Sequence, residues 1–62
     1  MRPGSKVRLR ADTEWDGIPL HAGEEATVVL SYLSETEFAE MVWVEFAEEA
    51  QAEFNADLLE VV

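Results

Sequence analysis

Apolar residues recur at every second position in three short segments of this 62-residue sequence. A period of two is the pattern of a β-strand that buries one face and exposes the other. We therefore expect strands over residues 6–10, 26–33 and 41–46. The residues expected to face the core are Val7 and Leu9, then Ala26, Val28 and Leu30, then Val42, Val44 and Phe46.

The segments between and after these strands are interpreted from their turn residues. Residues 11–23 hold polar residues together with two glycines and a proline, which indicates a long loop. Residues 34–40 read as a polar connection, and residues 58–62 are apolar enough for a short closing strand. The large apolar side chains of the long loop are expected to fold back onto the domain, and they are Trp15, Ile18 and Leu20.

Two segments are ambiguous between helix and other structure. Ser34 is followed three residues later by Glu37, the spacing of a capping box that starts a helical turn. Residues 47–53 are strong helix formers, but an isolated two-turn helix is marginal in water. We favour a turn at 47–50 followed by a strand at 51–54, and a short helix remains the alternative.

The length and the absence of cysteine limit the architecture. A chain of 62 residues forms one small domain, here residues 1–62, and without cysteine it has neither disulfides nor thiolate zinc sites. The hydrophobic fraction of 48% supports a compact core rather than disorder. No apolar run approaches the roughly 20 residues that span a membrane, and no signal peptide is visible. We expect a cytoplasmic protein with no membrane partner.

The order of expected elements resembles the Src-homology-3-like (SH3-like) small barrel. Residues 23–29 (GEEATVV) resemble the motif G-x-x-G-x-V-V that leads into a second strand, with Ala26 where a glycine is common. Residues 3–8 look like the opening of the small barrel proteins of photosystem I, and residues 54–62 are similar to their closing turn and last strand. The resemblance implies a mainly β, five-stranded antiparallel barrel, with room for one short helical turn near 34–40 or 47–54. It implies no binding residues.

Charge is segregated along the sequence. All four bases lie in the first ten residues, whereas residues 11–62 hold 14 acids and no lysine or arginine, for a net charge of −10. Such a chain does not bind nucleic acid by its phosphates, and a basic partner is expected instead. The outward bases of residues 6–10 are expected to pair with glutamates on adjoining strands.

Catalytic and metal motifs are lacking. The single histidine, His21, lies in the long loop, and no Gly-x-Ser-x-Gly elbow, phosphate loop or dinucleotide fingerprint occurs. Residues 12–17 partly match a calcium loop, but its twelfth position, Gly23, should be glutamate. We expect no enzyme activity, no cofactor and no metal site.

The aromatic residues and the acids together suggest a protein interface. Trp15 and Trp43 are the expected anchors, with Tyr32 and Phe38 as further members; alternatively, the loop folds over Trp43 and closes a minor core. The acids expected to contact a partner are Glu35, Glu37, Glu40, Glu45, Glu48, Glu49 and Glu53.

Two functions are the main candidates, and a nucleic-acid-binding barrel acting through Lys6, Arg8 and Arg10 is a third alternative. In the first, the acids imitate nucleic-acid phosphates and occupy the basic groove of a nuclease, restriction enzyme or CRISPR complex. Small phage-encoded anti-defence proteins (anti-CRISPR or anti-restriction) are similar in size and acidity. In the second, the domain is a structural accessory subunit that docks on a larger complex through its long loop and aromatics, and the acids only solvate it.

Overall fold

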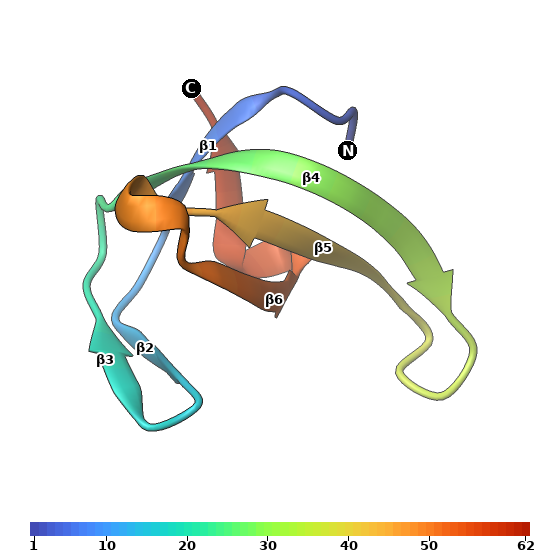
Figure 1. Ribbon diagram of the computed structural model, residues 1–62. Coiled ribbons are helices and arrows are strands. Elements are labelled where there is room, and N and C mark those ends of the chain that lie inside the picture. Colours follow the sequence, from blue (N-terminus) through green and yellow to red (C-terminus); the bar gives the residue numbers. More distant parts are fainter.

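The protein is mainly β, and its computed structural model describes all residues from Met1 to Val62 (Figure 1). Five strands form an antiparallel sheet in the order β6-β5-β4-β1-β7, and two more form a separate hairpin, β2-β3. The strands are β1 Lys6–Leu9, β2 Thr13–Trp15, β3 Ile18–Leu20, β4 Glu25–Ser34, β5 Ala39–Glu45, β6 Gln51–Asn55 and β7 Leu59–Val61. Two 3-10 turns, η1 Ala47–Glu49 and η2 Ala56–Leu58, flank β6.

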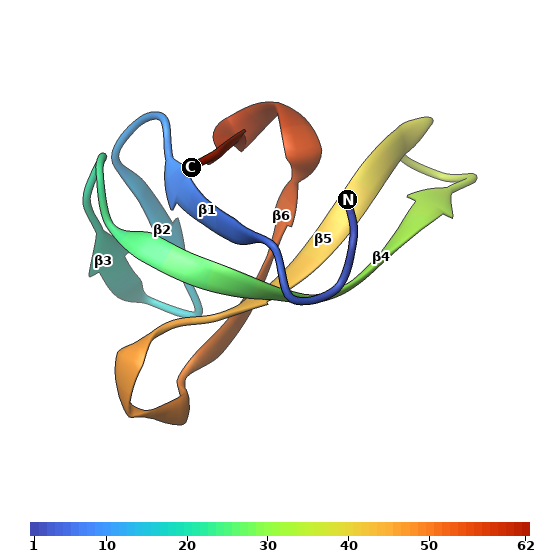
Figure 2. The same ribbon diagram turned by 90° about the horizontal axis from the view of Figure 1, so that it is seen from above.

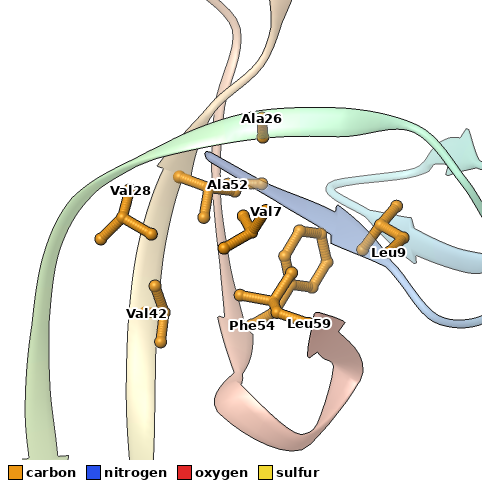
Figure 3. Packing of buried hydrophobic residues seen from close by; sticks show 9 residues of the cluster. Val7, Leu9, Ala26, Val28, Val42, Ala52, Phe54 and Leu59 are labelled. Atoms are coloured by element: carbon orange, nitrogen blue, oxygen red, sulfur yellow. The ribbon is translucent and has the colours of Figure 1, made fainter. Parts of the chain in front are cut away.

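The core lies inside the curve of the five-stranded sheet (Figures 1 and 3). The alternation in β1 is confirmed, because Val7 and Leu9 are almost fully buried while the bases beside them are exposed. β1 lies between β4 and β7, so its apolar face contributes to the centre of the cluster. The nine buried residues are Val7, Leu9, Ala26, Val28, Val42, Val44, Ala52, Phe54 and Leu59.

The expected closed five-stranded barrel is not formed. The sheet bends strongly around the core but stays open, since β6 and β7 pair with β5 and β1 respectively and not with each other (Figure 2). These edge strands are joined through the 3-10 turn η2, and β7 has only three residues, so no ladder closes the ring. The remaining strands form the two-stranded hairpin, giving five plus two strands.

The long loop expected over 11–23 is wrong in part, because it contains the β2-β3 hairpin. Asp16 and Gly17 have φ of 51° and 79°, the left-handed values that a two-residue type I′ turn requires. Asp-Gly between two short runs is a strong hairpin signal, but each run here has only three residues and the second contains Pro19, which weakens the strand pattern. Trp15 and Leu20 pack against the core as expected, but Ile18 is 58% exposed.

Leu30 is not a core residue, contrary to the alternation expected for 26–33. The pairing of β4 with β5 shifts between Val28 and Leu30, which inserts Val29 as an extra residue. Such a bulge reverses the faces of the residues that follow it. Leu30 therefore lies across from Trp43 and is 45% exposed.

The turn and strand favoured for 47–54 are confirmed. Phe46 N–H donates to the Ala50 carbonyl at 2.7 Å, and Glu48 and Glu49 have left-handed φ of 67° and 63°, so no α-helix forms. Ser34 also makes half of its capping box, since its Oγ accepts from Glu37 N–H at 3.1 Å, but a turn follows and not a helix.

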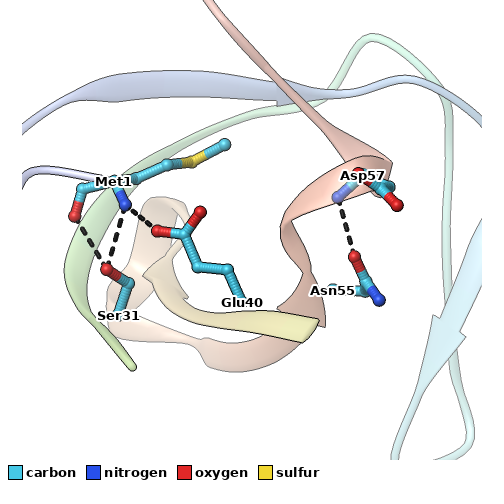
Figure 4. A network of polar contacts seen from close by, with 5 residues as sticks. All are labelled: Met1, Ser31, Glu40, Asn55 and Asp57. Atoms are coloured by element: carbon cyan, nitrogen blue, oxygen red, sulfur yellow. Dashed lines mark hydrogen bonds and ion pairs between the residues drawn. The ribbon is translucent and has the colours of Figure 1, made fainter. Parts of the chain in front are cut away.

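The closing strand is confirmed as β7, which follows η2. Asn55 caps this 3-10 turn, because its Oδ1 accepts from Asp57 N–H at 2.9 Å (Figure 4).

Candidate protein-binding surface

Two arginines of the basic segment are paired within the molecule. Arg8 lies opposite Glu60 in the β1-β7 ladder, and its Nε donates to Oε1 of Glu60 at 2.6 Å. Arg10 Nη1 lies 3.9 Å from the other carboxylate oxygen of Glu60. The hydrogen bond from Arg8 holds the pKa of the Glu60 carboxyl below its usual range. Pairing of bases with an adjoining strand is confirmed for these two, whereas Arg2 and Lys6 make no ion pair.

A shallow open hollow of about 500 Å³ lies beside these arginines. It is lined by Arg8, Leu9, Arg10, Ala22, Gly23 and Glu60. Both of its guanidinium groups already face the Glu60 carboxylate. With two guanidinium groups and one carboxylate, the lining of the hollow keeps a net charge of +1.

Glu40, an expected contact residue, is engaged inside the chain (Figure 4). The Met1 ammonium donates to the Glu40 carboxylate and to Ser31 Oγ, the latter at 3.0 Å. The Ser31 hydroxyl donates in turn to the Met1 carbonyl at 2.9 Å. The hydrogen bond from the ammonium lowers the pKa of Glu40. This carboxylate ties the start of the chain to β4 and β5.

Most other expected acids gather at one end of the sheet. Pairing of Glu45 with Gln51 and of Trp43 with Glu53 places these side chains on the face opposite the core. Glu48 and Glu49 continue this group on η1, at the turn between β5 and β6, and are exposed. Neither is in an ion pair.

Glu35 and Glu37 belong to a different part of the surface. Both are exposed in the turn between β4 and β5, which Figure 1 shows at the opposite end of the sheet from η1. The structure therefore separates the expected contact residues into two groups. A single small partner groove would contact one group or the other.

The two tryptophans contact each other. The rings of Trp15 and Trp43 meet edge to face with centroids 5.7 Å apart, and Trp15 also lies 6.2 Å from Phe54. An apolar cavity of about 60 Å³ adjoins Trp15 and Phe46. The loop thus folds over Trp43 and forms a minor core, as the alternative interpretation of the aromatics predicted.

Tyr32 and Phe38 do not join this cluster. Phe38 is 91% exposed, and Tyr32 is 44% exposed. The Tyr32 hydroxyl donates to Oε2 of Glu53 at 2.6 Å, and this hydrogen bond raises the pKa of the hydroxyl above its ordinary value. This contact was not predicted from the sequence because it joins strands β4 and β6, with β5 between them.

The remaining polar residues build turns. The Asp12 carboxylate accepts from Ala22 N–H at 2.9 Å, and Glu24 accepts from His21 N–H. No three acidic or histidine side chains gather as a metal site. None of the helices is long and apolar enough to cross a membrane. Comparisons with known proteins find no matching family model, curated protein or solved structure.

Proposed function

We propose that this protein is a non-enzymatic binding module whose acidic surface engages a basic protein surface. The observation that carries the proposal is the separation of charge in the fold. The arginines of the first strand segment share Glu60 on β7, while Glu45, Glu48, Glu49 and Glu53 at the η1 end face no base. Clustered charge of one sign steers and orients a partner of the opposite sign.

The partner class that fits is a protein with a basic groove for nucleic acid. Exposed carboxylates on a rigid sheet can take the place of phosphates in such a groove, as in anti-restriction or anti-CRISPR inhibitors. The chain order of strands, with a hairpin after the first strand and a 3-10 turn before the last, also supports an SH3-like plan for the module.

The test is binding to a panel of purified nucleases, restriction enzymes and CRISPR effectors, measured across salt concentrations and with competing DNA. E48Q/E49Q should weaken binding about tenfold at low salt and flatten its salt dependence. E35Q/E37Q removes the same charge from the turn between β4 and β5, at the opposite end of the sheet from η1, and should change affinity less than about twofold. If the affinity changed neither with salt, nor with competing DNA, nor in either variant, the acidic surface would be excluded as the binding site.

A further inference from the structure

The outer face of β4 and β5 carries an apolar patch that lies outside the nine-residue core, although Trp43 at its edge also contacts Trp15. In the ladder, Leu30 lies opposite Trp43 and Tyr32 lies opposite Met41. Residues directly opposite in an antiparallel pair have Cβ atoms about 4.5–5.5 Å apart on the same face. The four side chains therefore form a block of two by two, which we call the outer patch.

The Val29 bulge creates this patch. Without it, the alternation of β4 would carry Leu30 to the core side with Ala26 and Val28. With it, Leu30 and Tyr32 face outward and remain 45% and 44% exposed. Bulges commonly re-aim side chains next to binding sites. A chain with only nine buried core residues thus leaves large apolar groups outside the core.

The rim of the patch is acidic and partly fixed in place. Glu53 lies opposite Trp43, and Glu45 lies two residues along the same face. The Tyr32 hydroxyl donates to Glu53 across β5, which holds the ring against the rim. No lysine or arginine occurs in β4, β5 or β6. An aromatic and aliphatic centre with a charged rim is the composition of a protein-binding surface.

We infer that the outer patch is the docking site for a partner protein surface with an apolar centre and a rim of lysine or arginine. The inference rests on the proposed function, and it adds the contact that anchors the partner. Charge complementarity selects this occupant, because a second copy would bring the same acids against Glu45 and Glu53. An anionic membrane would be repelled for the same reason.

The test is a titration of the full chain, followed by backbone amide and indole NMR signals. One probe is a ten-residue peptide that alternates lysine or arginine with leucine or phenylalanine. The other has serine at every apolar position and the same charge. The first should bind saturably, about tenfold tighter than the second, and shift the signals of Leu30, Tyr32, Met41 and Trp43.

Matched variants assign the contact. Leu30→Ser, which keeps the Tyr32–Glu53 hydrogen bond, and L30S/Y32S should weaken binding of the apolar peptide, the double variant about tenfold. L33S/F38S changes side chains that are 81% and 91% exposed but lie outside the patch, and should leave affinity unchanged. The urea midpoint of each variant checks that the fold is retained.

Four results would overturn the inference or its basis. If both peptides bound with equal affinity and only the NMR signals of Glu48 and Glu49 shifted, the outer patch would be excluded as the docking site. The proposed binding through the acidic surface would still hold. If L33S/F38S alone lost binding, the residues that anchor the partner would be those at the turn between β4 and β5 and not those of the outer patch. If sedimentation showed a dimer of the wild type and a monomer of L30S/Y32S, the occupant of the patch would be a second copy of this chain and not a basic partner. Patch binding without salt dependence would instead contradict the proposed function and the basic rim.

Discussion

Val42 is fully buried on β5, where it faces the core opposite Phe54. Removing its two methyl groups loses transfer free energy and leaves a cavity, so Val42→Ala should cost about 2 kcal/mol. That is a large share of the roughly 3–9 kcal/mol expected for a domain of this size. Val61→Ala, at a position 61% exposed, is the control and should change stability by less than about 0.5 kcal/mol. Urea midpoints measure both, and equal losses would contradict the assigned core.

Glu60 should make stability depend on pH in a defined direction. Its pKa is lowered in the folded state by Arg8, so its stabilising contribution is present above the unfolded pKa and is lost as pH falls through the folded value. The difference in urea midpoint between the wild type and Glu60→Gln should be constant near neutrality and vanish in acid. Glu14→Gln, which removes an exposed unpaired carboxylate, should show no such loss. A difference that persists in acid would exclude the ion pair as its source.

At the scale of elements, η1 holds two glutamates in the left-handed region. Glu48 and Glu49 have φ of 67° and 63°, a conformation that costs an ordinary residue about 1–2 kcal/mol. Asparagine tolerates this region better, so Glu48→Asn should raise stability by up to about 1 kcal/mol. Glu35→Asn, without a left-handed φ, removes the same charge and is the control. Equal gains in the two variants would assign the effect to charge alone.

The sequence predicted elements best where local pattern and tertiary contact agree. The buried faces of β1 and β5, the turn at 47–50 and the strand after it follow from alternation and from the weakness of a two-turn helix. The Val29 bulge could not be predicted, because it depends on the register of β4 against β5. The same shift placed Leu30 on the surface although the alternation predicted it in the core, whereas Tyr32 and Trp43 were expected at an interface from the sequence. The openness of the sheet likewise depends on pairing between its edges.

At the scale of the whole molecule, the net charge of −10 acts across its full extent. The principal dimensions are 28 × 24 × 19 Å, comparable with the Debye length of about 30 Å at 0.01 M salt and above the roughly 10 Å at 0.1 M. Sodium chloride should therefore raise the urea midpoint by screening self-repulsion. The variant E35Q/E37Q/E48Q/E49Q has four fewer negative charges. Its urea midpoint at low salt should be higher than that of the wild type and should rise less when sodium chloride is added. A midpoint that falls with salt would mean that the Arg8 and Arg10 pairs outweigh the repulsion.

The position of β1 between β4 and β7 has a consequence for how the chain folds. Val7 pairs with Ala26 on one side and with Val61 on the other, so β1 gains its second neighbour only from the far end of the chain. Closing so long a loop costs entropy before any contact repays it. Pairings of this separation slow folding to roughly milliseconds or seconds, against microseconds for local topologies. Until then, the first strand exposes the hydrogen-bonding edge that β7 later covers, and Arg8 lacks the Glu60 carboxylate that later pairs with it.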